Sequence, residues 1–219
     1  MQVIWQSEVD PYCCKVLKKH WPEVTNYGDI REVDWSTVAR PDVICGGYPC
    51  QPFSLAGTRN GTKDIRHLWP YMFAAICHFR PRFAILENVR GHLSLGFGDV
   101  LQDLAKIGFN AEWQVLSAAT FGAPQKRERL FIVAYPNSTR RKRVNDNAKH
   151  TQEVCKRYAV FEPIKPSSSY VNASQWLSEP SLGRVADGVP NRVDRLRGLA
   201  NAVVPQIGEY LGRCIVNTI

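Results

Sequence analysis

The sequence has 219 residues, of which 44% are hydrophobic and 22% are charged, the proportions of an ordinary globular protein with one main domain. Its net charge of +8 favours a phosphate-bearing partner such as a nucleic acid. A basic surface that faces only solvent would give the same net charge. The chain has no Cys-x-x-Cys pair and no apolar stretch of bilayer length, which argues against a zinc ribbon and a membrane span. We therefore expect a reducing, cytoplasmic protein with no signal peptide and no metal.

Short apolar runs alternate with helical patterns in the first part of the chain. Residues 3–5 predict a buried strand, and an Asp-Pro start predicts a helix over residues 10–20. Residues 41–45 predict a second buried strand, which the glycines at 46–47 break. A helical pattern follows over residues 69–79 and is halted by a proline.

The same alternation continues further along the chain. Residues 83–86 predict a third strand with Glu87 at its carboxyl end. Apolar residues spaced over 100–107 mark one helix face, with Asp99 as its cap and Gly108 as its stop. Strands and helices in this order predict an α/β fold with a doubly wound, mostly parallel sheet, in which ligands sit beyond the carboxyl ends of the strands.

The later residues predict three further features. Residues 113–116 and 130–133 predict an antiparallel pair of edge strands. A helical stripe near the end consists of Ile207, Tyr210, Leu211, Cys214 and Ile215. The composition changes after residue 136, so we expect a catalytic domain over 1–135, a small irregular recognition or linker region over 136–194, and a closing segment over 195–219 that packs back on the catalytic domain.

The loop over residues 46–54 contains two glycines, two prolines and Cys50 at its apex, directly after a predicted buried strand. A thiol exposed there is a candidate nucleophile, because a thiolate needs no triad to be reactive. The alternative is a small buried hydrophobe, the usual fate of a free cysteine. We adopt that alternative for four others: Cys13, Cys45, Cys77 and Cys214.

Two further stretches carry candidate chemistry. Burial of Glu87 would raise its pKa and allow it to donate a proton, although a salt-bridged or capping glutamate is common. Arg127 and Arg129 are two residues apart at the entry to a strand, so their side chains point the same way and suit a carboxylate, phosphate or base edge. A charged loop is the alternative for this pair.

In their order, these stretches resemble the motifs of DNA (cytosine-5) methyltransferases of bacteria and phages. Pro49-Cys50-Gln51 is similar to the nucleophile motif, Glu87-Asn88-Val89 to the acid motif, and residues 125–129 to the two-arginine motif. Asn201-Ala202-Val203-Val204-Pro205 is similar to the closing motif. The resemblance covers most of residues 3–135 and then residues 195–215.

The resemblance implies a reaction and its catalytic residues. Cys50 would add to carbon 6 of a cytosine flipped out of duplex DNA, and Glu87 would hydrogen-bond or protonate ring nitrogen 3. Arg129 would contact the base oxygen, and Arg127 would support the nucleophile loop. The methyl donor would be S-adenosylmethionine, in the fold typical of methyltransferases that use it.

The resemblance also assigns binding residues. The implied cofactor contacts are Glu8, Asp29, Ile30, Pro49, Asn201 and Val203. The implied DNA contacts are Gln51, Ser54 and Gln125. The positive charge of the run Arg140, Arg141, Lys142 and Arg143 suits contact with DNA phosphates. Double-stranded DNA is the expected partner, together with a cognate restriction endonuclease, and we expect a monomer with no membrane partner.

Three departures from the family pattern qualify these expectations. The family's first strand and its glycine-rich loop do not precede residue 3, which predicts weak cofactor binding and reduced stability. Residues 136–194 are few for a recognition domain, although their basic charge suits phosphate contact. Ala200 stands where the family commonly has glycine.

Two other functions remain as alternatives. The first is a truncated, catalytically impaired remnant that binds DNA without turnover. The second is a cysteine hydrolase that uses Cys50, but this requires a histidine base, and His67, His78 and His92 have no recognisable motif around them.

Overall fold

The computed structural model describes residues 1–49, 68–137, 161 and 192–218. Its strands are β1 Trp5–Gln6, β2 Thr25–Asn26, β3 Val43–Gly47, β4 Phe83–Val89, β5 Phe109–Ser117 and β6 Glu128–Pro136. Its α-helices are α1 Pro11–His20, α2 Trp69–Phe79, α3 Phe97–Lys106, α6 Arg192–Asn201 and α7 Pro205–Thr218. Short 3-10 helices are η1 Trp35–Thr37, η3 Arg90–Ser94 and η4 Ala118–Phe121.

The main sheet has the strand order β3-β4-β6-β5. β3 and β4 are parallel, whereas β6 runs antiparallel to both of its neighbours. β1 and β2 form a separate parallel pair. These pairings confirm the predicted α/β class with its parallel strands, and they confirm the antiparallel pair predicted around residues 113–116 and 130–133.

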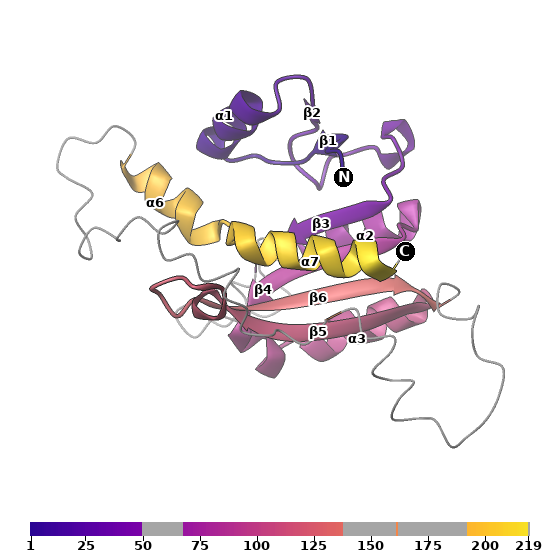
Figure 1. Ribbon diagram of the computed structural model, residues 1–219. Helices are drawn as coiled ribbons and strands as arrows, with labels where there is room; N and C mark the ends of the chain where they lie inside the picture. The colour runs from indigo at the N-terminus through magenta and orange to yellow at the C-terminus, as the bar shows by residue number, and fades with distance from the viewer. Residues whose placement is uncertain (50–67, 138–160, 162–191, 219) are drawn as a thin grey trace, which may run out of the picture.

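Helices cover both faces of the main sheet (Figure 1). Because successive strand residues point to opposite faces, Ala84 and Leu86 of β4 pack with α2 and α3, while Phe83 packs with α7. The predicted helical stripe on α7 is confirmed, since every member is buried. Burial of each large apolar side chain contributes about 1.5–3 kcal/mol, so this stripe is sufficient to hold α7 on the sheet.

The helix ends follow local rules, with one exception. Asp10 caps α1 as predicted, because its carboxylate accepts hydrogen bonds from the amides of Tyr12 and Cys13, both at 3.0 Å. α2 ends before Pro81, as predicted. α3 differs, because it begins at Phe97 after a left-handed Gly96, and Asp99 lies inside its first turn instead of capping it. The carboxylate of Asp99 is still favourable there, near the positive end of the helix dipole.

The prediction that the glycines after residue 45 break the strand is wrong. Gly46 and Gly47 continue β3 and pair with Leu86 and Glu87 of β4. A Cβ atom at Gly46 would lie 2.9 Å from Cε of Met72, so the absence of a side chain at Gly46 lets Met72 of α2 pack closely against β3. Glu87 itself lies within β4 and not beyond its end.

The first strand is shorter and more exposed than predicted. β1 covers only two residues, and the side chains before it are exposed, Val3 by 39% and Ile4 by 44%. Trp5 connects this part of the chain to the rest: its Nε1 donates to the carbonyl oxygen of Ala39 at 2.9 Å, and its ring packs against Phe79. An apolar run is buried only where another layer covers it, and none of the described elements covers Val3 and Ile4.

Burial of the cysteines was predicted correctly only for Cys214. Cys13 and Cys77 are half-buried. Cys45 is exposed, because it alternates with the buried Ile44 along β3 and so faces the opposite side of the strand.

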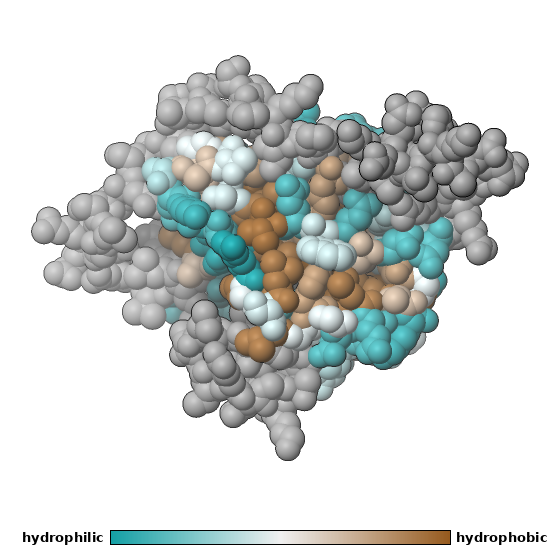
Figure 2. All heavy atoms as spheres, turned by 90° about the horizontal axis from the view of Figure 1, so that it is seen from below, coloured by the Kyte–Doolittle hydropathy of each residue, from teal (hydrophilic) through white to brown (hydrophobic). Residues whose placement is uncertain are grey.

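The outer surface of the described residues is mixed in character. Seen from below the view of Figure 1, a band of apolar side chains crosses this surface with hydrophilic residues beside it (Figure 2). β5 is an edge strand, and its Trp113 is 47% exposed. Within the described residues, no helix combines the length and the apolar character that crossing a bilayer requires.

Candidate active site

Glu87 lies near the carboxyl end of β4, with its side chain 18% exposed. In the parallel pairing of β3 and β4, its direct partner is Gly47. A Cβ atom at Gly47 would lie 2.8 Å from Oε2 of Glu87, which is closer than real Cβ contacts come. The carboxylate therefore occupies space over the end of β3 that only a glycine leaves open.

Arg129 of β6 lies beside this carboxylate, with its Nε 3.1 Å from Oε1 of Glu87. Arg129 is the direct partner of Val89, which shares a sheet face with Glu87, so the two charged side chains are diagonal neighbours. Burial raises the pKa of the Glu87 carboxyl, while the positive charges of Arg129 and Arg127 act in the opposite direction and are outweighed. The net effect is a pKa above the ordinary value of a glutamate.

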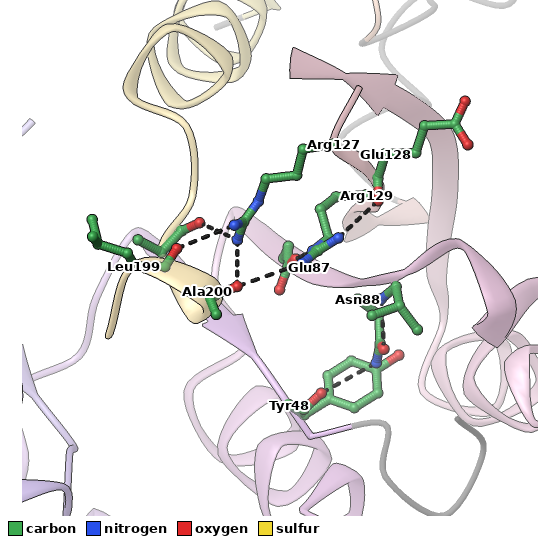
Figure 3. Close-up of polar contacts among 10 residues, drawn as sticks. Tyr48, Glu87, Asn88, Arg127, Glu128, Arg129, Leu199 and Ala200 are labelled. Carbon is green, nitrogen blue, oxygen red and sulfur yellow. Dashed lines mark hydrogen bonds and ion pairs between the residues drawn. The ribbon is translucent and has the colours of Figure 1, made fainter. Parts of the chain in front are cut away.

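Arg127 reaches across to the end of α6 (Figure 3). Its Nη1 donates to the carbonyl oxygen of Leu199 at 3.1 Å, and its Nη2 donates to those of Ala200 and Ala202 at 2.6 and 2.7 Å. Arg129 also donates to the carbonyl of Ala200, at 3.5 Å. The last carbonyls of a helix carry partial negative charge, so a guanidinium is well suited to them. This contact connects residues more than 70 positions apart in the sequence.

Tyr48, directly after β3, is held at two of its polar atoms, and we call this arrangement the Tyr48 clamp. Its carbonyl oxygen accepts a hydrogen bond from Nδ2 of Asn88 at 3.2 Å. Its hydroxyl lies 2.9 Å from Nε2 of His92. Asn88 and His92 are the two buried polar residues of the described chain, with exposures of 2% and 1%. The start of the loop that leads to Pro49 is thus fixed against β4 and η3.

The residues expected to hold a nucleoside lie at one edge of the β1–β2 pair. Glu8 follows β1, and its Oε1 accepts from the amides of Val9 and Asp10, both at 2.8 Å. Asp29 follows β2 and accepts from the backbone amide and Nε of Arg31. The hydrogen bonds from Arg31 lower the pKa of Asp29 to about 2. The side chain of Ile30 is partly buried against the main core.

Other predicted site residues are placed as follows. Pro49 is half-buried, while Gln125, Asn201 and Val203 are exposed. Seven predicted residues lie outside the described part of the chain: Cys50, Gln51, Ser54, Arg140, Arg141, Lys142 and Arg143. Within the described part, no three His, Cys, Asp or Glu side chains gather in a way that could hold a metal ion.

The structure therefore brings Glu87, Arg129 and Arg127 together with the end of α6. Arg127 was expected to support the nucleophile loop, and its guanidinium hydrogen-bonds the carbonyls at the end of α6. Glu8 and Asp29 belong to the separate β1–β2 pair, which meets α6 through α1: a Cβ atom at Gly198 would lie 3.5 Å from the ring of Tyr12. Three contributors were missed by sequence reasoning: Gly47, Tyr48 and His92. The position of Tyr48 directly before Pro49 was the one available signal, since His92 has no motif around it.

Comparison with solved structures agrees with the observed architecture. A mutant of DNMT2 from Spodoptera frugiperda superimposes with a TM-score of 0.52 at 21% sequence identity, covering 66% of this chain and 46% of the other. At that identity the likeness concerns the fold alone. The two chains therefore share an arrangement of strands and helices over the superimposed part.

The family follows from the sequence comparison. The model of the C-5 cytosine-specific DNA methylase family matches residues 1–181, and the chain belongs to this family. It is 39% identical over 112 residues to the Type II methyltransferase M.AplI of Arthrospira platensis. The matched residues make up 50% of this chain and 32% of that relative. It is 40% identical over 139 residues to M.Eco47II of Escherichia coli. These residues make up 60% of this chain and 33% of that relative. The matches thus extend over about a third of the length of these relatives.

Proposed function

We propose that this chain carries the base-activating site of a DNA (cytosine-5) methyltransferase. The reaction transfers a methyl group from S-adenosylmethionine to carbon 5 of a cytosine flipped out of duplex DNA. The observation that carries the proposal is the half-buried Glu87–Arg129 pair above Gly47, which is three residues before Cys50. Consecutive Cα atoms are about 3.8 Å apart, so chain connectivity keeps the Cα of Cys50 within about 11 Å of that of Gly47.

The chemistry requires a nucleophile and an acid on one ring. In the first step the Cys50 thiolate forms a bond to carbon 6, and protonated Glu87 donates a hydrogen bond or proton to nitrogen 3, which turns carbon 5 into a nucleophile. The carbon-5 electron pair would then bond to the methyl carbon while the bond from that carbon to the donor's sulfur breaks, which leaves S-adenosylhomocysteine. Finally a base removes the carbon-5 proton, the bond between Cys50 and carbon 6 breaks, the ring double bond re-forms, and any proton on nitrogen 3 returns to Glu87.

Glu87 and Arg129 suit the edge of the base that this reaction uses. Nitrogen 3 and the oxygen on carbon 2 are adjacent on cytosine, and the carboxyl and guanidinium lie side by side at 3.1 Å. Burial raises the pKa of Glu87 above its ordinary value, which is the direction that a proton donor needs. Positive charge on Arg129 would stabilise negative charge that develops on the ring oxygen in the transition state.

S-adenosylmethionine supplies the methyl group when it is bound. The residues after β1 and β2 fit its nucleoside part. Carboxylate oxygens accept from ribose hydroxyls and from an exocyclic amine. Among the described residues, the Glu8 carboxylate is engaged through Oε1, so Oε2 faces no protein donor. Asp29 would have to share its oxygens with Arg31. Ile30 offers an apolar contact for a purine ring, and we infer that Pro49, Asn201 and Val203 complete this site.

Duplex DNA is the proposed substrate, and its phosphates suit the positive charge of the chain. The basic run over residues 140–143 would neutralise phosphates and supply sequence-independent affinity. Gln51, Ser54 and the exposed Gln125 would contact the strand from which the base is flipped. The Type II methyltransferases among its relatives favour a cognate restriction endonuclease as a functional partner.

Covalent trapping tests the proposal. The full chain is incubated with S-adenosylmethionine and duplex DNA containing 5-fluorocytosine, in which fluorine replaces the proton that must leave for Cys50 to be released. We expect a denaturation-resistant adduct from the unaltered chain and none from Cys50→Ser. Cys77→Ser, which changes a half-buried cysteine of α2, is the matched control and should form the adduct.

The outcomes separate the proposal from its alternatives. Retained DNA binding without an adduct would favour the impaired remnant. An adduct that survives Cys50→Ser would show that the nucleophile is another residue. The Cys50→Ser variant should bind DNA with nearly unchanged affinity, because the thiol acts mainly in the transition state.

A further inference from the structure

The Tyr48 clamp stands directly before the proposed nucleophile. Tyr48 is two residues from Cys50, and both its carbonyl oxygen and its hydroxyl are in hydrogen bonds. The side chain is buried, with an exposure of 7%, and its ring packs against Trp69 at 5.2 Å and edge-on against His92 at 5.5 Å. A hydroxyl in such apolar surroundings must find a partner, and His92 provides one.

The surroundings of His92 define the direction of this hydrogen bond. Its Nδ1 lies 2.9 Å from the carbonyl oxygen of Leu95. A carbonyl can only accept, so Nδ1 carries the proton and, in the neutral ring, Nε2 accepts from the hydroxyl of Tyr48. The imidazole is thereby oriented by the backbone of η3, and in turn it orients Tyr48.

The groups that hold Tyr48 are on the same stretch of chain as the proposed acid. Glu87 and Asn88 are consecutive in β4, and His92 follows in η3 without an intervening loop. A hydrogen bond is directional, whereas apolar packing alone tolerates shifts of the ring. The clamp therefore fixes the start of the nucleophile loop relative to Glu87, and not only to the core.

We propose that Tyr48 and His92 are positioning residues, whose hydrogen bond holds the start of the Cys50 loop in register with Glu87. This inference rests on the proposed function, because it assigns a catalytic consequence to the clamp. Both side chains are buried, so we assign them no direct contact with the base. Their contribution lies in the geometry with which the thiolate meets carbon 6, where small misplacements are costly.

Adduct formation with 5-fluorocytosine DNA, measured as a rate at saturating DNA and cofactor, tests this role. Tyr48→Phe removes the hydroxyl alone, and we expect the rate to fall about tenfold with the DNA Kd unchanged within about twofold. His92→Leu should have a similar effect. His92→Gln should recover part of the rate, because its amide oxygen can accept near the position of Nε2. Combining Tyr48→Phe with His92→Leu should lower the rate no further than either change alone.

The matched control is Tyr135→Phe. Tyr135 also has a low exposure, of 6%, and its hydroxyl donates to Oε1 of Glu112 at 2.6 Å, in a contact between β6 and β5. A purely structural hydroxyl would lower the melting temperature and leave the rate unchanged, as we expect for this control. If Tyr48→Phe matched Tyr135→Phe in rate, the positioning role would be overturned.

Amide exchange separates failure of this inference from failure of the proposed function. If the unaltered chain forms no adduct, the proposed function fails, and hydrogen–deuterium exchange still decides on the clamp. We expect Tyr48→Phe to accelerate exchange in the peptide over residues 46–54 by at least threefold, and Tyr135→Phe to leave it unchanged. Equal exchange rates in both variants would show that the hydrogen bond between Tyr48 and His92 does not hold the start of this loop.

Discussion

Gly47 and Glu87 face each other across the parallel pair β3–β4, so closely that a Cβ atom at residue 47 would lie 2.8 Å from the carboxylate. Gly47→Ala should therefore displace the acid. Because the displaced atoms are at the end of a flexible side chain, we expect a small loss of melting temperature but a fall of at least about tenfold in adduct rate.

The control for this change is Gly91→Ala, where an added Cβ atom would meet nothing within 4 Å. It should leave the adduct rate unaltered. If Gly47→Ala kept the full rate while remaining folded, Glu87 would not act from the position that the structure gives it.

The stability of the fold should depend on pH through Glu87. Burial raises its pKa in the folded state above that of the unfolded chain, so the folded state binds the proton more tightly. Its contribution to stability is therefore fully present below the ordinary carboxyl pKa and is lost as the pH rises through the raised value. Compared with Glu87→Gln, the unaltered chain should lose stability as the pH rises above about 4.

Urea unfolding of both proteins between acidic and neutral pH measures this difference. A Glu87→Gln variant whose relative stability falls as the pH rises would mean that the ion pair with Arg129, and not burial, governs the acid.

Arg127→Lys should loosen the end of α6. A lysine cannot reproduce the forked contacts with the carbonyls of Leu199, Ala200 and Ala202. We expect the free energy of unfolding to fall by about 1–2 kcal/mol, since hydrogen bonds of a charged donor are removed. Amide exchange near residues 202–204 should accelerate. Arg213→Lys, which alters an exposed pair with Glu209 on α7, should change little.

The salt dependence of DNA binding should report on the basic run. Replacing Arg140, Arg141, Lys142 and Arg143 by alanine should weaken binding to all duplexes alike. The slope of log Kd against log salt should decrease by about one for each phosphate that the variant no longer neutralises. Fluorescence anisotropy over a range of salt concentrations measures it. An unchanged slope would remove this segment from the DNA interface.

Much of the fold could be predicted because it depends on local patterns. The capped start of α1, the end of α2 at Pro81 and the stripe on α7 each follow from neighbours in sequence. The placement of Glu87 and Arg129 beside one another was expected from the resemblance to the family, because the two residues lie on different strands and no local pattern pairs them.

Other features depend on contacts between distant residues and could not be predicted. A pair of glycines usually ends a strand. Here Gly46 and Gly47 continue β3, and the side chains of Met72 and Glu87 occupy the space that the glycines leave open. The hydrogen bond between Tyr48 and His92 joins residues 44 positions apart, and no local pattern encodes it.

The acid, the amide and the imidazole are all carried by the uninterrupted backbone from Glu87 to His92. The number of residues between them is therefore fixed. Deleting or inserting one residue there would turn side chains of β4 to the opposite face and separate Glu87 from Asn88 and His92, the two hydrogen-bond partners of Tyr48. Length variation among homologous enzymes should therefore be absent from this stretch and tolerated in the connections on either side of it.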